Sequence, residues 1–277
     1  MKDTGERHIV NHHFTNKSEL YLHLMHIATY EYAKTFVKGK KVLDYGCGSG
    51  YGSHMLSEKA ESVTGVDISK EAVDFATQEY QSPNMNFKTI SEIGAEKFDI
   101  ITSFQVIEHV PEDKKYTFAL KNLLKPGGIL IISTPDKKHR LFKYIQQPWN
   151  IFHLKEYTPE SLEKLLRNYF PNVDILKIGS DSDLVLEEIK RTKKERIFVL
   201  PSTLSVYPYF LRVFLLKLQK NIFHFLKKIK NGNTQQIHLQ NKTDNFVNKY
   251  SHEDIVFRKE MRYSTDLLAI CRNEEEI

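Results

Sequence analysis

The stretch KVLDYGCGSGYG, residues 41–52, decides the fold. Its first five residues are mainly apolar, as in a buried strand, and they lead into a turn with glycine at alternate positions from Gly46 to Gly52. Glycine lets the backbone approach a ligand more closely than a side chain would permit, and residues 53–59 then have the pattern of a helix. The stretch therefore predicts a strand, a ligand-binding turn and a helix.

The glycine spacing argues against a dinucleotide-binding turn. Counted from Gly46, the fingerprint G-x-G-x-x-G needs its third glycine at position 51, where the chain has Tyr51. Asp44, two residues before the first glycine, would also be unfavourable near a pyrophosphate. The turn on its own is therefore a weak indication of any particular ligand.

Strands and helices alternate along the first half of the chain, which predicts a parallel sheet with crossover helices. A helix over residues 18–37, with Ser18 as its N-cap, is expected before the first strand. Further strands are expected at residues 62–67, 85–88, 98–104, 129–133, 173–178 and 266–271, and further helices at residues 69–80, 114–124 and 158–169.

A segment of roughly 85 residues separates the last two predicted strands, far more than a usual connection. Within it, apolar residues recur at steps of four and three, which predicts an amphipathic helix with Arg212 and several lysines on its remaining surface. The apolar stripe consists of Leu211, Leu215, Leu218, Ile222, Phe225 and Ile229. The expected organisation is an N-terminal helical lid at residues 1–39, a core at 40–180, a basic helical insertion at 181–262, and a final core strand and tail at 263–277.

Composition bounds the class of protein. The chain has 277 residues, 40% of them hydrophobic, and a formal net charge of +5, which excludes a disordered or collagen-like chain. Cys47 and Cys271 cannot form a disulfide framework, and residues 1–10 lack the apolar core of a signal peptide. No run of about 18 apolar residues occurs. We therefore expect a cytoplasmic protein without a spanning helix.

The positive charge is concentrated in the insertion. Residues 190–230 hold eleven Lys and Arg against one acid, so the rest of the chain is slightly acidic. Three interpretations stay open: the apolar stripe is core or a subunit interface such as a homodimer, residues 204–230 make a peripheral membrane contact, or the segment is a basic lid that attracts an anionic substrate. Nucleic-acid binding is disfavoured, because no recognised module accompanies the charge.

Several motifs carry a family resemblance. Residues 42–50 resemble the first motif of class I S-adenosylmethionine-dependent methyltransferases, and residues 66–69 resemble the acidic end of their second strand. Residues 98–101 and 124–128 are similar to two further landmarks, in order and at familiar separations. The resemblance implies a Rossmann-like α/β fold, with a seven-stranded, mostly parallel sheet whose last strand is antiparallel and preceded by a helical insertion.

The resemblance also implies S-adenosylmethionine as cofactor and a set of residues that hold it. Asp44 would organise the turn and meet the methionine end, and Asp67 would accept both ribose hydroxyls. Ser91 would substitute for an Asp with which the family often reads adenine, and Gln105 would lie near the reacting methyl group. The full predicted set is Asp44, Tyr45, Gly46, Cys47, Gly48, Gly50, Asp67, Ile68, Ser91 and Gln105.

Residues 107–110, IEHV, look like the methyltransferases of ubiquinone biosynthesis, some relatives of which bind a divalent metal through E-x-x-E-H. Gln105 stands at the first position, and an amide serves Mg²⁺ less well than a carboxylate, so we predict no metal. The N-terminal histidines His8, His12, His13, His23 and His26 lack carboxylate or thiol partners at fixed spacing, so we expect a lid there.

A looser resemblance joins residues 5–7 and 50–53 to methyltransferases of bacterial cell-surface glycan assembly, which points to a sugar hydroxyl as acceptor. Deprotonation of a hydroxyl benefits from a base near neutral pH, and His109 and His153 follow the fourth and fifth strands, at the ligand-binding edge. For His109 the alternative is a structural role, and Glu108 and Glu156 are expected to support the loops.

The sequence thus predicts O-methylation of a small molecule or glycan precursor. The alternative is a catalytically silent methyltransferase-like subunit that binds a partner through the helix at residues 211–229.

Overall fold

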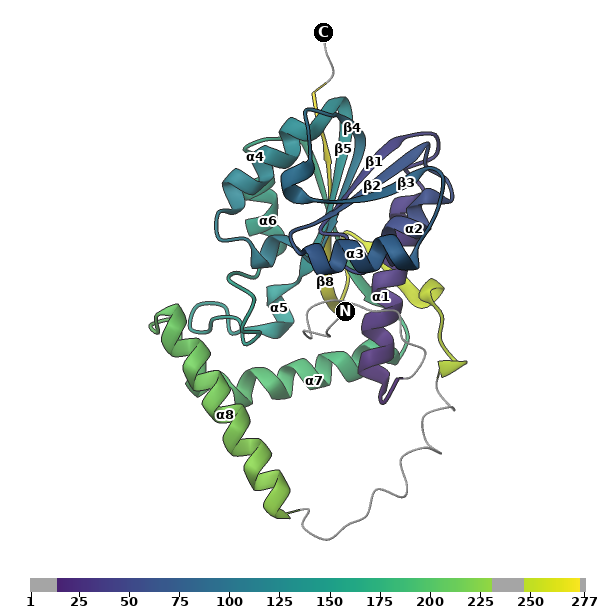
Figure 1. Ribbon diagram of the computed structural model, residues 1–277. Helices are drawn as coiled ribbons and strands as arrows, with labels where there is room; N and C mark the ends of the chain where they lie inside the picture. Colours follow the sequence, from purple (N-terminus) through teal and green to yellow (C-terminus); the bar gives the residue numbers. More distant parts are fainter. Residues whose placement is uncertain (1–13, 231–246, 275–277) are drawn as a thin grey trace.

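The computed structural model describes residues 14–230 and 247–274, which form an eight-stranded sheet in the order β3-β2-β1-β4-β5-β8-β6-β7 (Figure 1). The five strands from β3 to β5 pair in parallel, and β8 is antiparallel to both β5 and β6. The strands are β1 Lys41–Tyr45, β2 Ser62–Asp67, β3 Met85–Thr89, β4 Phe98–Phe104, β5 Leu124–Pro135, β6 Asn172–Ser180, β7 Ile255–Arg258 and β8 Ser264–Arg272. The predicted fold class is confirmed; the sheet has eight strands instead of seven, because the short edge strand β7, inside the predicted insertion, pairs with β6.

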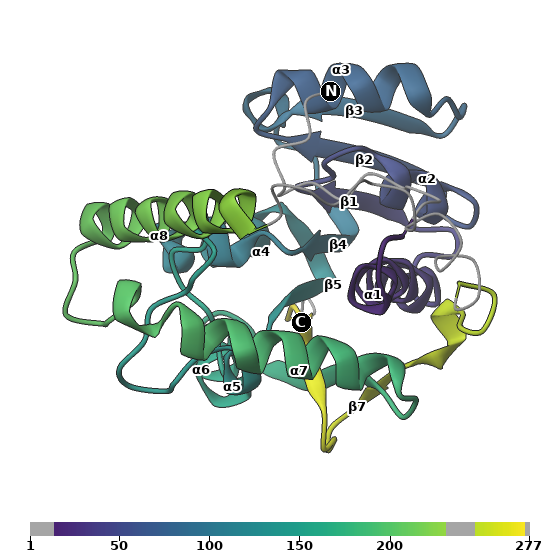
Figure 2. The same cartoon turned by 90° about the horizontal axis from the view of Figure 1, so that it is seen from below.

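Helices cover both faces of this sheet, whereas α8 lies away from it (Figure 1 and Figure 2). The helices are α1 Lys17–Lys34, α2 Tyr51–Ser57, α3 Lys70–Glu79, α4 Asp113–Leu123, α5 Lys137–Arg140, α6 Pro159–Leu166, α7 Leu184–Phe198 and α8 Tyr209–Lys230, with short 3₁₀ helices η1 Ile90–Glu92, η2 Ile107–His109, η3 Leu200–Ser202 and η4 His252–Asp254. Successive strand residues point to opposite faces, so Val42 packs in the cluster with α1 and α7 while Leu43 packs in the cluster with α4 and α6. The central strands are therefore buried on both sides.

The strand order reverses at β1. The chain runs outward through β2 and β3 and then returns to place β4 on the other side of β1. In open α/β sheets, ligands bind outside the carboxyl ends of the strands at such a reversal. The glycine turn after β1, Asp67 at the end of β2 and Gln105 after β4 all lie at this edge.

Helix α1 begins at a different residue from the predicted one. Its N-cap is Asn16, whose side chain accepts a hydrogen bond from the Glu19 amide at 3.0 Å. Ser18 is instead buried and donates to Glu188 on α7, so it ties two helices together. The first part of the predicted lid, with His8, His12 and His13, lies outside the described residues.

Helix α8 corrects two expectations about the insertion. Arg212, predicted on the surface, is only 1% exposed, whereas Leu218, Ile222 and Phe225 of the apolar stripe are 44%, 51% and 63% exposed. The stripe is therefore not core of the described chain, because periodicity shows which residues share a face but not what covers it. No helix within the described residues combines the length and apolarity needed to cross a bilayer.

A substitution at Gly52 tests how closely α1 packs against α2. A Cβ at this position would lie 1.9 Å from the buried ring of Tyr30 on α1. We expect Gly52→Ala to lower the free energy of unfolding by about 1–2 kcal/mol, because overpacking costs about 1–3 kcal/mol and helix propensity returns up to about 1. Urea unfolding followed by circular dichroism measures this. Gly94→Ala, where a Cβ meets nothing within 4 Å, is the control, and equal stability of both variants would contradict this packing.

Candidate functional site

The Asp44 carboxylate is buried near the end of β1, two residues before the glycine turn begins. It is 1% exposed and accepts hydrogen bonds from Ser53 Oγ at 2.7 Å, Thr102 Oγ1 at 2.9 Å and the Tyr30 hydroxyl at 3.3 Å. Burial raises the pKa of this carboxyl to about 6, although the three hydroxyl donors limit the rise. Asp44 does not line the cavity in front of the turn. Its side chain instead joins the strand before the turn to α1, α2 and β4.

A cavity of about 390 Å³ lies in front of the turn, and we call it the turn cavity. The predicted residues Tyr45, Gly46, Cys47, Gly48, Asp67, Ile68 and Gln105 line it; Asp44, Gly50 and Ser91 do not. Gly50 instead starts α2 with a φ of 87°, where a Cβ would meet Ala76 at 2.6 Å. The remaining lining residues are His26, Tyr30, Ser49, Tyr51, Ile90, Phe104, Val106, His109 and Phe152.

Asp67 links the turn to the end of β2. Its carboxylate accepts from the backbone N–H of Gly48 at 3.0 Å and of Ser69 at 2.8 Å. The next residue, Ile68, is 85% exposed at the cavity, which is unusual for so large an apolar side chain. Ser91 bonds Thr89 within its own segment, and its neighbour Ile90 lines the cavity instead.

Gln105 separates the turn cavity from a second one. It is the non-glycine residue with positive φ (57°) among those described, a strained conformation that its contacts must stabilise. Its Nε2 atom donates to Asp266 Oδ1 at 3.1 Å and to Ser133 Oγ at 3.3 Å. Gln105 and His26 line both cavities, so the two spaces adjoin at these side chains.

The second space, which we call the inner cavity, measures about 660 Å³. Polar and apolar groups from α1, α5, α7, α8, β8 and the loop before α6 meet around it. Its lining residues are Leu22, Met25, His26, Gln105, Pro135, His139, Arg140, Trp149, Asn150, His153, Glu188, Ile189, Arg191, Thr192, Lys220, Thr265 and Asp266.

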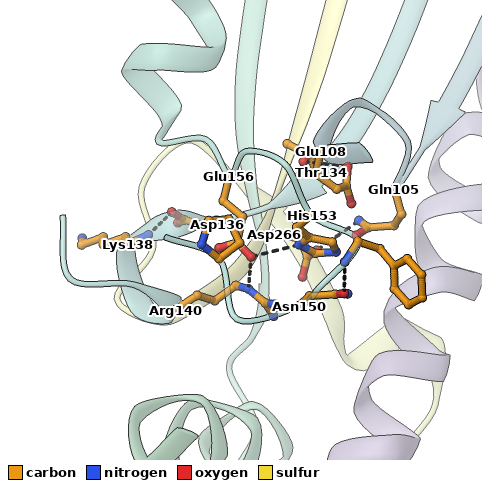
Figure 3. Close-up of polar contacts among 12 residues, drawn as sticks. Gln105, Glu108, Thr134, Asp136, Lys138, Arg140, Asn150, His153, Glu156 and Asp266 are labelled. Carbon is orange, nitrogen blue, oxygen red and sulfur yellow. Dashed lines mark hydrogen bonds and ion pairs between the residues drawn. The ribbon is translucent and has the colours of Figure 1, made fainter. Parts of the chain in front are cut away.

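His153 has a fixed orientation in the wall of the inner cavity (Figure 3). Its Nδ1 lies 3.0 Å from Glu156 Oε1, the same oxygen that accepts from Arg140 Nε at 3.2 Å. Burial would raise the pKa of Glu156, but the Arg140 guanidinium and His153 outweigh it and hold that pKa below its usual value. Because the ionised Glu156 accepts the Nδ1 proton, Nε2 of His153 is the nitrogen that can accept a further proton.

His109 lies beside His153 but faces the turn cavity. The two rings meet edge to face, 4.8 Å between centroids, and His109 Nδ1 lies 3.2 Å from the carbonyl oxygen of Phe152. Burial and the neighbouring His153 lower the pKa of His109 to about 4, so its imidazole is neutral near pH 7. The two predicted histidines are thus in contact with each other, but His109 lines the turn cavity and His153 lines the inner cavity.

Glu108, His109 and His153 offer three ligand atoms within 4.8 Å of one another. Glu108 Oε2 accepts from Thr134 at 3.0 Å, while Oε1 is buried without a partner among the described residues. Burial raises the pKa of Glu108 to about 8, which leaves this acid protonated near neutral pH. The Gln105 amide is directed to Asp266, so the donor set has one carboxyl and two imidazoles and does not suit Mg²⁺.

Arg212 joins α8 to the loop that carries His153. Its guanidinium donates to the carbonyl oxygens of Pro148 at 2.9 Å and of His153 at 3.0 Å, and the Tyr209 hydroxyl donates to the Ile151 carbonyl oxygen at 3.0 Å. A buried arginine that satisfies loop carbonyls fixes their positions. The start of α8 therefore supports the loop behind His153, a role that nothing near Arg212 in the sequence indicates.

Known proteins resemble this chain over about half of its length. A family profile described as a methyltransferase domain matches residues 21–169, more than half of the chain. The ubiquinone biosynthesis O-methyltransferase of Coxiella burnetii is 37% identical over 131 residues, which cover 44% of this chain and 56% of that protein. The one of Haemophilus ducreyi is 31% identical over 138 residues, which cover 45% of this chain and 58% of that protein. The chain thus spans little more than half the length of these relatives.

Two solved structures share the fold. The YcgJ protein from Bacillus subtilis has a TM-score of 0.52 at 14% identity and covers 91% of this chain and 100% of its own. The cyclase SpnF also has a TM-score of 0.52, at 15% identity, and covers 98% of this chain and 90% of its own. At such identities the likeness concerns the fold alone. The profile match, which begins within α1 and ends just after α6, shows that the chain belongs to the methyltransferase domain family, the class I S-adenosylmethionine-dependent methyltransferases, with S-adenosylmethionine as its cofactor.

Proposed function

We propose that the protein transfers a methyl group from S-adenosylmethionine to a hydroxyl oxygen of a small molecule or glycan precursor. The observation that carries this proposal is that the turn cavity and the inner cavity adjoin at Gln105, with the His153–Glu156 pair on the inner side. These walls can hold a methyl donor on one side of Gln105 and an acceptor on the other. The names of the relatives in Coxiella and Haemophilus support oxygen as the acceptor atom.

The turn cavity supplies the groups that a nucleoside needs. The carboxylate of Asp67 has two oxygens with two lone pairs each, so it can accept from ribose hydroxyls while it keeps its bonds to Gly48 and Ser69. The exposed Ile68 and the nearby Ile90 provide apolar surface for a base. We propose that Asp44 acts indirectly, through the position of the turn.

His153 is proposed as the general base. S-adenosylmethionine supplies an electrophilic methyl group, and methyl transfer requires the acceptor oxygen, the methyl carbon and the sulfur in line. His153 Nε2 would accept the hydroxyl proton as the new carbon–oxygen bond forms and the methyl–sulfur bond breaks to leave S-adenosylhomocysteine, while Nδ1–H continues to donate to Glu156. The ionised Glu156, held by Arg140, would stabilise the resulting imidazolium. His109, neutral and beside the loop carbonyl, would keep this ring in place.

The inner cavity continues into an apolar compartment of about 800 Å³, with which it shares Trp149, Asn150 and Lys220. Its other apolar lining residues are Ile151, Phe152, Phe198, Val199, Leu216 and Phe223, and Lys194, Glu195, Lys217 and Gln219 add polar groups to the lining. An acceptor with an apolar body therefore fits this space better than a bare sugar. The exposed apolar face of α8 supports, as separate proposals, the expected peripheral membrane contact or a homodimer.

The same exposed face favours the alternative of a catalytically silent subunit that binds a partner through α8. Turnover separates the two. Methylation of any compound in a panel of sugars and phenols supports the enzyme, whereas cofactor binding without turnover, together with a stable hetero-complex, supports the silent subunit.

Replacement of Asp67 tests the cofactor site. We expect Asp67→Ala to raise the Kd of S-adenosylhomocysteine about tenfold to a hundredfold, because hydrogen bonds to a charged group contribute about 1.5–3 kcal/mol. Isothermal titration calorimetry measures the affinity, and Glu79→Ala, an exposed acid on α3, is the control. An unchanged affinity for Asp67→Ala would refute this role of the carboxylate.

Replacement of His153 tests the base. We expect His153→Ala to lower kcat about 10²- to 10⁴-fold, because general-base catalysis contributes on that scale. Cofactor affinity should not change, since His153 does not line the turn cavity. His252→Ala, on η4 in the insertion, controls for loss of a histidine. A His153→Ala enzyme with full activity would remove the residue from the mechanism.

A further inference from the structure

A third cavity, of about 470 Å³, lies apart from the site and shares no lining residue with the turn cavity or the inner cavity. It lies where α5, the first turn of α6, the end of α7 and β6 converge. Its volume is within the range of about 300–1,000 Å³ that is usual for small-molecule sites. Its lining residues are Lys137, Lys138, Leu141, Phe142, Lys143, Thr158, Pro159, Glu160, Lys177 and Arg196.

Positive charge dominates this lining. The lining has four lysines and one arginine against a single acid, Glu160. A hydrogen bond from the Thr158 side chain, together with the positive charges of Lys143 and Lys177, lowers the pKa of Glu160. Lys177 pairs at 3.5 Å with Glu260, which is 94% exposed, and the other three lysines form no ion pair with any described residue. Cations gathered around one concave space repel one another and attract anions strongly, so the free cavity is left with uncompensated charge.

Arg196 adds a more specific signal. Its guanidinium stacks on the ring of Phe142, 4.5 Å from the ring centroid, which fixes its plane. Its Nε atom is buried and has no hydrogen-bond partner in the described part of the chain. A buried donor without a partner costs free energy, and a planar guanidinium matches the oxygens of a phosphate.

The short helix α5 divides its basic residues between two spaces. Lys137 and Lys138 line the third cavity, whereas His139 and Arg140 line the inner cavity. Figure 3 shows Lys138 extending away from His153, while Arg140 reaches toward Glu156. The third cavity is therefore a neighbour of the acceptor site and not a part of it.

We propose that the third cavity binds a diphosphate group. A single phosphate monoester carries roughly −1.5 to −2 charges near pH 7, and a diphosphate adds a second anionic phosphate, so it matches the excess of cations better than one carboxylate or one phosphate would. Arg196 would donate to one phosphate with its fork, and Lys137 and Lys177 would neutralise the other as point charges. This proposal goes beyond methyl transfer and does not depend on it.

Binding of inorganic pyrophosphate tests the proposal, with S-adenosylhomocysteine present at saturation to occupy the turn cavity. We expect saturable binding by calorimetry and a rise in Tm beyond that given by sodium chloride at equal ionic strength. Lys177→Gln and Arg196→Lys should each weaken pyrophosphate binding about tenfold. Lys114→Gln, which removes the same charge from α4 outside the cavity, should bind as the unaltered protein does.

Two results would overturn the proposal: no binding of pyrophosphate beyond the effect of chloride, or equal weakening by Lys177→Gln and Lys114→Gln. Competition against bound pyrophosphate then identifies the kind of molecule that carries the diphosphate group. Displacement of pyrophosphate by a nucleoside diphosphate supports a soluble ligand, and displacement by a prenyl diphosphate in detergent supports a lipid one. The variants that lose pyrophosphate binding should bind S-adenosylhomocysteine with an unchanged Kd. A negative result for pyrophosphate therefore leaves the proposed function untouched, and the reverse also holds.

Discussion

The buried carboxylate of Asp44 is the contact on which the arrangement of the cofactor side depends. It stands near the end of β1 and accepts hydroxyl donors from β4, α2 and α1, through Thr102, Ser53 and Tyr30. A buried carboxylate is tolerated only when such donors satisfy it, so these elements must keep their relative positions. The glycine turn starts two residues later, and its shape is thereby coupled to the sheet and to α1.

The loop that carries His153 depends on a different set of contacts, made with the segment from α7 to α8. Arg212 of α8 donates to the carbonyl oxygens of Pro148 and His153, at the two ends of the loop. Just before this loop, Gln146 donates to the Arg196 carbonyl oxygen and to the Thr203 hydroxyl. Residues far away in the sequence, outside the strand–turn–helix unit of β1 and α2, thus fix the position of this loop. Gln105, strained and bonded to Asp266, lies where the two cavities meet. In the proposed function, the core would bind the methyl donor and the insertion would shape the space for the acceptor.

Most of the residues proposed for the cofactor could be named from the sequence because they lie at the ends of predicted strands. Asp67 and Ile68 follow one strand and the glycines follow another, so the strand endings predict one shared edge, and the resemblance to methyltransferases is what assigned these residues to the cofactor. Ser91 does not line the turn cavity, because in the 3₁₀ turn η1 it is the preceding residue, Ile90, that reaches it. His153 could be proposed from its place on a loop after the fifth strand, whereas its link to Arg140 depends on tertiary packing that no periodicity encodes. Arg212 was wrongly assigned to the surface for the same reason.

A crystal structure of the protein with S-adenosylhomocysteine would show where the sulfur lies relative to the two cavities. We expect the ribose at Asp67, the base beside Ile68 and Ile90, and the sulfur at the Gln105 end of the turn cavity, facing the inner cavity and His153. A ligand bound in the inner cavity, or a sulfur directed away from Gln105, would contradict this placement.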